Sequence, residues 1–377
     1  MTKTVLMVGI GDLAGLILNL LVQEREFGKI VLAGRNLEEM TRRKNLAMLF
    51  STQLGRYHPI ECVQMDLDNE DQSAQLISRL KPDVILNTAT RQSGRIITQL
   101  PPQVFNQLDL AQFGPWLPMH LSAVYKLMRA VRQSGQSPMV VNAAFPDAVG
   151  PVLRAVNLAP TVGIGNVANM LPALRGAVGL LLETPLQEVN VALYTQHYLS
   201  HRVPAHGDSA GAPYFATVEH RGVNVTHEVD FEAAFKLVKS RFQRTAGAFR
   251  QLITASSAMS ILCPVLQHRT ALAHAPAPHG LPGGYQVRIA GGEVSVALPK
   301  DVDLKTLVGI NNDCQRFDGI DRIAPDGTVY FTEKEMRVMK DMLGYECLRM
   351  PLCDIDDRAE ELGERYAEFA RKAVEFA

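Results

Sequence analysis

The start of the chain contains a glycine-rich turn between an apolar strand and an apolar helix. The strand runs into the sequence Gly-Ile-Gly-Asp-Leu-Ala-Gly at residues 9–15, and a helical pattern follows. Gly9 permits a tight turn, Gly11 has no Cβ that would keep a diphosphate away from the backbone, and Ala14 or Gly15 lets the helix lie close to the strand. The helix N-terminus offers free N–H groups to phosphate oxygens. The segment predicts a dinucleotide-binding site; a glycine turn in another βα unit is the alternative.

The end of the second strand indicates which dinucleotide the turn holds. Enzymes that use NAD usually place Asp or Glu about twenty residues after the glycines, where the carboxylate binds the ribose 2′-OH. This chain has Gly34 and Arg35 there, followed by Asn36. A carboxylate would repel a 2′-phosphate, whereas a guanidinium binds it through paired hydrogen bonds. The sequence therefore favours NADP over NAD as the cofactor.

Length and composition limit the classes of protein to consider. The chain has 377 residues, of which 47% are hydrophobic and 20% charged, and its formal net charge is −1. This length suits two domains, and the charge gives no support for nucleic acid or an anionic membrane as a partner. No apolar run reaches about 18 residues and the chain enters a strand at once, so we expect neither a membrane span nor a signal peptide. The five cysteines are scattered without zinc-site spacing, which favours a reduced, cytoplasmic setting and no metal.

The first 150 residues alternate strand patterns with helix patterns. Short apolar runs typical of buried strands lie at residues 4–8, 29–34, 60–65, 84–87 and 139–142. Helical patterns lie between them, and this alternation predicts an α/β domain with a Rossmann-type, doubly wound parallel sheet. Residues 91–118 break the rhythm, and we expect them to form a loop over the cleft.

Polar residues follow two of these strands, where a ligand of such a sheet would lie. Asp66 comes just after the third strand, on the side where we expect the adenine. The Asn-Thr-Ala sequence at 87–89 ends the fourth strand, on the side of the nicotinamide; ordinary polarity at strand ends is the alternative in both cases. The residues that we expect to hold the cofactor are Gly9, Gly11, Asp12, Leu13, Ala14, Arg35, Asn36, Asp66, Asn87, Thr88 and Ala89.

After residue 150 the pattern changes to hairpins and separate helices. We expect hairpin turns at 221–222, 291–292 and 326–327. We expect helices at 231–250, from Thr332 to Gly344 behind a capping box, and at 356–376. These features predict an α+β substrate and dimerisation domain over residues 151–377, after a dinucleotide-binding domain over 1–150. The final helix can pack back on the first domain, and the hairpin sheet, whose open face needs a cover, predicts a homodimer.

One segment completes a pattern seen in a known family. Val-Val-Asn-Ala-Ala-Phe-Pro-Asp at 140–147, the Val-Leu pair at 152–153 and the Gly-Ile-Gly-Asn-Val-Ala-Asn stretch at 163–169 follow the parallel strands. Together with the glycine turn they resemble the saccharopine dehydrogenase-like reductases over about residues 1–175. The family's usual Pro-Gly at the later turn is replaced here by Gly-Ile-Gly. The helix near 119–134 also looks like that of extended short-chain dehydrogenases, but their Tyr-x-x-x-Lys pair is absent.

The resemblance implies hydride transfer between NADPH and an imine or ketone of a small carboxylated, amino-acid-like substrate. Such a site needs a proton donor, and cations or amides that hold the carboxylate. His197 follows a strand of the second domain and is the leading candidate for the donor, with His279 and Asp147 next. Arg202 could anchor the carboxylate. Asn142 and Asn166 should face the same cleft and contact the substrate.

Alternative interpretations of the second domain remain open. His197 and His201 are four residues apart, which would place them on one face of a helix, but a strand exit or a surface loop is the more natural context. A zinc site with His206 lacks a cysteine or carboxylate to complete it. The glycines at 283–284 could approach a ligand or form a tight turn, and the polar residues at 311–318 could bind substrate or form a loop.

Three functions therefore compete. The first is an NADP-dependent oxidoreductase with a cleft between its domains. The second is a non-catalytic NADP-binding sensor or assembly factor, which predicts a cleft without a proton donor. The third is an extended short-chain carbonyl reductase or epimerase, which the missing Tyr–Lys pair disfavours. Polar groups recur at strand ends of the second domain, and this favours the oxidoreductase.

Overall fold

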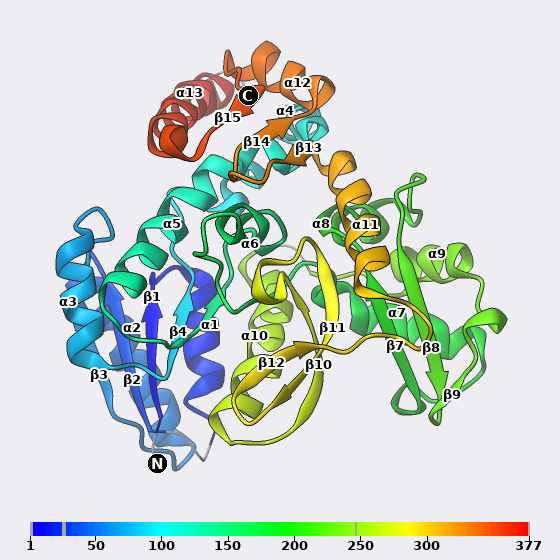
Figure 1. The fold of residues 1–377 in the computed structure, drawn as a ribbon, viewed down its shortest axis with the longest axis horizontal. Coiled ribbons are helices and arrows are strands. Elements are labelled where there is room, and N and C mark those ends of the chain that lie inside the picture. The colour runs from blue at the N-terminus through cyan, green and yellow to red at the C-terminus, as the bar shows by residue number, and fades with distance from the viewer. Residues whose placement is uncertain (1–2, 25–27, 246, 376–377) are drawn as a thin grey trace.

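The computed structural model describes residues 3–24, 28–245 and 247–375 of the chain. A six-stranded parallel sheet occupies the N-terminal part, and three small antiparallel sheets follow it (Figure 1). This arrangement is the α/β fold with a Rossmann-type sheet and an α+β second part, so the predicted fold class is confirmed.

The parallel sheet has the strand order β3-β2-β1-β4-β5-β6. Its strands are β1 (Thr4–Val8), β2 (Lys29–Gly34), β3 (Ile60–Gln64), β4 (Val84–Asn87), β5 (Met139–Asn142) and β6 (Val162–Gly163). The winding direction reverses between β1 and β4, and in open sheets of this kind the ligand crevice lies at the carboxyl ends of the strands on either side of that point. The glycine turn after β1 lies at this position.

Helices cover both faces of the parallel sheet. They are α1 (Asp12–Leu21), α2 (Leu37–Gln53), α3 (Glu70–Leu80), α5 (Leu117–Gln133) and α6 (Pro146–Arg154). Val5 and Met7 of β1 pack in the core cluster that contains α1 and α2, whereas Leu6 and Val8 pack in the cluster that contains α3, α5 and α6. Alternate side chains of a strand point to opposite faces, so β1 is apolar throughout because both of its faces are buried.

The second part combines two three-stranded antiparallel sheets with five helices. The strands are β7 (Val189–Tyr194), β8 (Phe215–His220), β9 (Val223–Asn224), β10 (Ala271–Pro276), β11 (Gly284–Ala290) and β12 (Glu293–Val296). A single bridge between Thr195 and Gly284 joins the two sheets. The helices are α7 (Val167–Leu181), α8 (His197–His206), α9 (Phe231–Arg241), α10 (Leu252–Leu266) and α11 (Leu304–Gln315).

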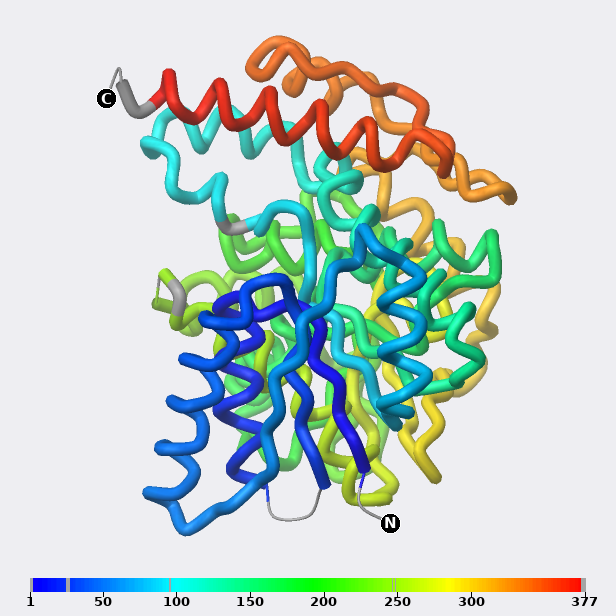
Figure 2. Tube along the Cα trace, turned by 90° about the vertical axis from the view of Figure 1, so that its left-hand side faces the viewer, coloured from blue at the N-terminus to red at the C-terminus, as the bar shows by residue number. Residues whose placement is uncertain are grey.

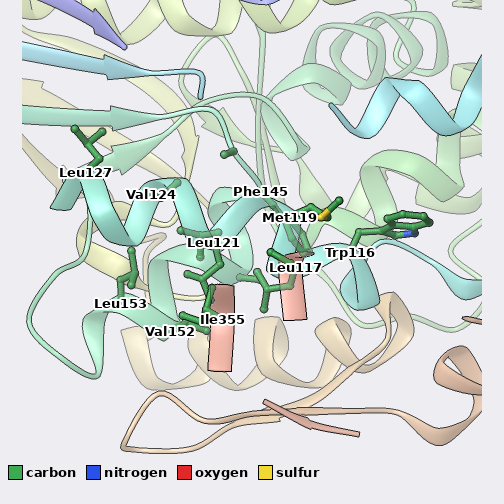
Figure 3. Packing of buried hydrophobic residues seen from close by; sticks show 14 of the residues in the cluster. Trp116, Leu117, Met119, Leu121, Val124, Leu127, Phe145, Val152, Leu153 and Ile355 are labelled. Atoms are coloured by element: carbon green, nitrogen blue, oxygen red, sulfur yellow. The ribbon is translucent and has the colours of Figure 1, made fainter. Parts of the chain in front are cut away.

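The C-terminal segment folds over the N-terminal half. It contains β13 (Ile320–Ile323), β14 (Val329–Phe331), β15 (Arg349–Met350), α12 (Glu333–Leu343) and α13 (Ile355–Glu375). Helix α13 packs along α5, and Figure 2 shows it running across the top of the molecule, while α4 (Pro102–Leu108) packs against α12. Ile355 of α13 belongs to the same buried cluster as Leu121 of α5 and Val152 of α6 (Figure 3). The ring of Tyr366 lies 5.6 Å from that of Trp116, which anchors the middle of α13.

Local predictions had mixed outcomes. The hairpins β8–β9 and β11–β12 turn where the sequence predicts. The predicted helix over 231–250 is wrong in its second half, because α9 ends at Arg241 and a separate helix, α10, begins at Leu252. The segment 91–118 forms short helices rather than an irregular loop. At α12 the Thr332 hydroxyl donates to the Glu335 carboxylate, and neither makes the predicted reciprocal cap.

One helical segment, Phe249–Leu266, is long and apolar enough to cross a membrane by length and composition. Within this structure it includes α10, which packs against α1 on one side and against β10, β11 and α7 on others. A helix that packs against neighbours on several sides needs apolar residues on more than one face.

Candidate active site

Three adjoining cavities run along the carboxyl ends of the parallel strands and into the second part of the chain. The glycine cavity, about 500 Å³, is lined by Gly9, Gly11, Arg35, Asp66 and Thr88 among others. The junction cavity, about 490 Å³, shares Gly11 and Thr88 with it and reaches Phe113, Phe145 and His197. The arginine cavity, about 670 Å³, shares Phe113 and His197 with the junction cavity and contains His201, Arg244 and Arg250. His197 therefore lies where the junction and arginine cavities meet.

The glycine turn has the backbone geometry that the sequence predicts. Gly9 has a φ of +87°, and a Cβ on it would lie 2.6 Å from the backbone nitrogen of Ala89. The turns after β1 and β4 therefore touch, and the Thr88 hydroxyl also donates to the Gly9 carbonyl at 3.0 Å. A Cβ on Gly11, in contrast, would meet no atom within 4 Å. Because no side chain caps α1 at Gly11, the first turn of that helix is open toward the cavity and fits a diphosphate.

Ala14 and Gly15, the remaining small residues of the motif, contact different neighbours. Ala14 is buried against the sheet and gives the close helix–strand contact. Gly15 makes room for Arg43 of α2, whose guanidinium would lie 2.5 Å from a Cβ there. Arg43 pairs with Glu39 at 2.9 Å and with Asp12 at 3.5 Å. Asp12, Leu13 and Ala14 all line the junction cavity, as the cofactor prediction requires.

Arg35 lies at the mouth of the glycine cavity directly after β2. It is exposed and forms no ion pair with any carboxylate of the described ranges. Asn36 lines the same cavity, but its side chain caps α2 by accepting the Glu39 N–H at 2.9 Å. Asp66 also lines the cavity, and one of its oxygens accepts the N–H of Asp68 at 3.1 Å.

The asparagines that end β4 and β5 have a structural role. Both side chains are fully buried, and the Asn87 amide donates to the Asn142 oxygen at 2.9 Å. Asn142 also accepts the Ala144 N–H at 3.0 Å, and Asn87 accepts the Ala89 N–H at 3.2 Å. Neither asparagine lines one of the three cavities. The predictions of Asn142 as a substrate ligand and Asn87 as a cofactor ligand are therefore corrected: these amides hold the two turns in shape.

His197 is the first residue of α8, a helix that begins at the Gln196 cap and ends at Gly207. Its Nδ1 lies 2.9 Å from Oδ2 of Asp318, whose side chain is only 3% exposed. The other oxygen of Asp318 accepts the N–H of Phe113 at 3.3 Å. Burial by itself lowers the pKa of His197, but the nearby carboxylates, chiefly Asp318, raise it above the ordinary value. The result is an imidazole that favours its protonated form inside a cavity.

Aromatic rings surround the imidazole. The rings of Phe113 and Phe145 lie 4.8 Å and 5.4 Å from that of His197. The backbone of Phe145 has a φ of +38°, which is a strained conformation for a phenylalanine. The start of α6 holds the residue in this conformation. The neighbouring His120 is buried, and this lowers its pKa to about 3, so it stays neutral. His197 is therefore the histidine of this cluster that can carry a proton near neutral pH.

Asp147 lies in the first turn of α6 with no exposed surface. One of its oxygens accepts the Asn166 amide, and the other has no hydrogen-bond partner among the described residues. Burial raises the pKa of Asp147 to about 6, although His197 and Asn166 act in the opposite direction. Asp147 lines none of the three cavities, whereas Asn166 lines two of them. The catalytic prediction for Asp147 is corrected: it influences the charge of His197 without reaching a substrate.

Arg202 does not reach the cleft. Its guanidinium binds the Asp208 carboxylate through two bonds of 2.8 and 3.1 Å, and it lines none of the three cavities. The predicted carboxylate anchor is therefore wrong. The cations of the arginine cavity are Arg244 and Arg250, which the sequence analysis did not single out although they stand in a basic stretch after α9.

Because α8 is a helix and not a strand exit, His197 and His201 lie on one of its faces. Both line the arginine cavity, and Nε2 of His201 lies 3.2 Å from Oδ2 of Asp109. Across the described ranges, no cluster of three or more histidine, cysteine or carboxylate groups is placed to hold a metal ion.

No protein-family model matches this sequence, and no curated protein matches it. Solved structures are similar in fold. Malate dehydrogenase from Plasmodium falciparum in complex with NADH has a TM-score of 0.52 at 11% identity, over 97% of this chain and 99% of that one. Lactate dehydrogenase from Cryptosporidium parvum, complexed with lactic acid and β-nicotinamide adenine dinucleotide, has 0.55 at 14% identity, over 84% and 98%. Malate dehydrogenase from Aeropyrum pernix has 0.54 at 11% identity, over 83% and 97%.

The fold of this chain is similar to that of these malate and lactate dehydrogenases. At such low identity the likeness concerns the fold, and the chemistry has to be argued from the cleft itself. The finer resemblance to saccharopine dehydrogenase-like reductases stays a prediction.

Proposed function

We propose that the protein is an NADPH-linked oxidoreductase that transfers a hydride between the nicotinamide and an imine or ketone carbon of a small carboxylated, amino-acid-like substrate. One observation carries this proposal: the His197–Asp318 pair lies where the junction cavity, which begins at the glycine turn, opens into the arginine cavity. A proton donor at that position suits a carbonyl or imine that is reduced next to the nicotinamide.

The residues of the cleft fit a dinucleotide. The open first turn of α1 and the space above Gly11 would take the diphosphate, and Thr88 and Ala89 line the path onward. Bound there, the cofactor would supply the hydride or accept it.

Arg35 supports NADP as the cofactor. The similar malate and lactate dehydrogenase structures contain NADH or nicotinamide adenine dinucleotide. In this chain the position after β2 carries a guanidinium that forms no ion pair with the described residues, which suits a 2′-phosphate better than a free ribose hydroxyl. Glu39 at the same mouth is neutralised by Arg43 at 2.9 Å, so it adds little repulsion.

His197 would act as the general acid during reduction and as the base in the reverse direction. Asp318 engages Nδ1, so Nε2 is the nitrogen that faces the substrate and gives up its proton. Asp318 fixes the plane of the ring and favours its protonated form, and the Phe113 N–H fixes Asp318 in turn. The rings of Phe113 and Phe145 keep water from this side of the imidazole.

The presence of this donor argues against the two other functions. A non-catalytic sensor predicts a cleft without a proton donor, whereas His197 is held there by a buried carboxylate. An extended short-chain reductase would need a Tyr-x-x-x-Lys pair, which the sequence lacks. In place of Arg202, the arginines at 244 and 250 are the groups that can hold the substrate carboxylate.

The proposal is tested by following NADPH consumption with a panel of 2-oxo acids, each alone and with an amino acid present to form an imine. We expect at least one combination to be reduced, with the alcohol or amine product identified by mass spectrometry. The catalytically impaired control is His197→Ala. If no combination in the panel gives product at saturating NADPH, the proposed reaction is overturned.

A homodimer formed through the second-domain sheets remains part of the proposal. Large apolar side chains are exposed along these sheets, among them Leu272 of β10 at 53% and Val223 of β9 at 64%. Exposed apolar surface of this kind suits a protein partner. Light scattering that returns a monomer at micromolar concentration would count against it.

A further inference from the structure

Two arginines of the arginine cavity have no carboxylate partner among the described residues. Arg244 and Arg250 come from the segment between α9 and α10 and line the same cavity as His197. Neither forms an ion pair with a carboxylate in any part of the chain that the structure describes. Burial and the positive charge of Arg250 lower the pKa of Arg244, which means that the two guanidinium groups are close enough to repel each other. Like charges held together without a counter-ion are typical of a binding site for an anion.

The carboxylates of this cavity do not neutralise the pair, because each already has a histidine. Asp318 lies 2.9 Å from His197, and Asp109 lies 3.2 Å from His201. The carboxylates that line the arginine cavity thus pair with the histidines of α8 and not with the arginines. A ligand has to supply the negative charge that the arginines lack.

Neutral donors lie next to the arginines. The Asn169 amide donates to Oγ1 of Thr254 at 2.9 Å, so the Thr254 hydroxyl proton is left to donate to a ligand. Both residues line the arginine cavity. The cavity of about 670 Å³ is within the range of small-molecule sites.

We propose that the arginine cavity takes a dianion: the substrate carries two acidic groups, carboxylate or phosphate, that Arg244 and Arg250 bind together. The reaction assigned to this dianion rests on the proposed function, but its binding does not. Two guanidinium groups present several N–H donors in planar pairs, which match the oxygens of two carboxylates or of one phosphate. A monoanion would leave one arginine unpaired in the cavity.

Binding is measured first, by calorimetry on the full chain without cofactor at constant ionic strength. The probes are succinate and inorganic phosphate as dianions and acetate as a monoanion. We expect a dianion to bind at least tenfold more tightly than acetate. Succinate binding without phosphate binding identifies a dicarboxylate as the ligand class, and the reverse identifies a phosphate ester; acetate that binds as tightly as both dianions would overturn the proposal.

Variants locate the site. Arg244→Gln and Arg250→Gln should each weaken dianion binding about tenfold to a hundredfold, the usual range for a lost hydrogen bond between charged groups. Arg241→Gln is the matched control, because Arg241 is an exposed residue at the end of α9 that lines none of the three cavities. Circular dichroism and NADPH affinity should match the unmodified protein in all three variants. Unchanged dianion affinity in both Arg244→Gln and Arg250→Gln would overturn the proposal.

Activity separates this inference from the proposed function. With NADPH, we expect kcat/KM for 2-oxoglutarate or a phosphorylated 2-oxo acid to exceed that for pyruvate at least tenfold, and the excess to vanish in Arg250→Gln. If no 2-oxo acid is reduced but dianion binding depends on the arginines, the proposed reaction fails and the anion site stands. If pyruvate is reduced as efficiently as the dianions and the variants have no effect, the reaction stands and the dianion inference fails.

Discussion

Oδ2 of Asp318 lies 2.9 Å from Nδ1 of His197, although 121 residues of chain separate the two. Asp318 stands between α11 and β13, at the start of the segment that folds back over α5, whereas His197 begins α8. The Phe113 N–H, from the segment before α5, holds the same carboxylate. The proposed proton donor of the cleft is thus assembled from three separate parts of the chain.

Asp318→Asn should lower the pKa of His197, because the carboxylate that favours the imidazolium is replaced by a neutral amide of the same shape. The protonated donor would then be lost at a lower pH. We expect the alkaline limb of the kcat/KM profile for reduction to move down by about one to three pH units. Asp321→Asn, on β13 and paired with Arg316 at 3.0 Å, is the control that should leave the profile in place. Identical profiles for Asp318→Asn and the unmodified protein would show that Asp318 does not set the charge of His197.

Gly11→Val should abolish NADPH binding in a folded protein. A Cβ at this position would meet no atom of the described residues within 4 Å, so the added side chain would enter the space proposed for the diphosphate. Gly9→Ala is the contrasting variant, because its Cβ would collide with the Ala89 backbone at a φ of +87°. We expect Gly9→Ala to lose about 1–3 kcal/mol of unfolding free energy. Chemical denaturation and fluorescence titration separate the two effects, and retained NADPH affinity in folded Gly11→Val would place the diphosphate elsewhere.

Arg35→Asp should reverse the preference between the two cofactors. The unmodified protein is expected to bind NADPH at least tenfold more tightly than NADH, because the guanidinium can pair with the 2′-phosphate. Arg42→Asp tests whether net charge alone matters, since Arg42 is exposed on α2 and pairs with Glu38 outside the cavities. Fluorescence titration gives both affinities. Equal affinities of the unmodified protein for NADPH and NADH would contradict the assignment.

Asp147→Asn should make stability less dependent on pH. Burial raises the pKa of Asp147 to about 6 from an ordinary 3.8, so between these values the folded protein holds a proton that the unfolded chain releases. This stabilising proton is present below pH 4 and lost as the pH rises through 6, a change of about 3 kcal/mol. We expect Asp147→Asn to be more stable than the unmodified protein at pH 8, with the difference shrinking toward pH 4. Denaturation series at several pH values would contradict this if the two proteins lose stability in parallel.

Much of the parallel sheet could be predicted because its signals are local. The glycine turn, the apolar strands and the caps of the following helices involve residues within a few positions of one another. The helix α10 was missed because small polar residues stand on both its buried and its exposed sides, such as Ser257 and Ser256, so it has no clear amphipathic period to recognise. The helix α8 was missed because it begins directly after β7, a position that favoured a strand exit.

A polar residue in the sequence can either bind a ligand or form hydrogen bonds within the protein, and the residue type does not distinguish the two. The site was therefore harder to predict than the fold. Asn142 looks like a ligand-binding amide, but Asn87 and Ala144 already take up its hydrogen bonds. Arg202 looks like a carboxylate anchor, but Asp208, six residues away, binds it. No local signal connects Asp318 to His197, since only the folded chain brings them together. His197, Asn166 and Gly11 do line the junction cavity, and their roles in binding and catalysis stay predictions.

The central claim is that His197 donates the proton when a hydride moves from the cofactor to the substrate. The most direct test follows deuterium from NADPH labelled at the nicotinamide C4 into the product of a 2-oxo acid or imine, for the unmodified protein and for His197→Ala. The account predicts labelled product from the unmodified protein and a rate about 10² to 10⁴ lower in His197→Ala, at unchanged NADPH affinity. Label transfer by His197→Ala at the unmodified rate would contradict it.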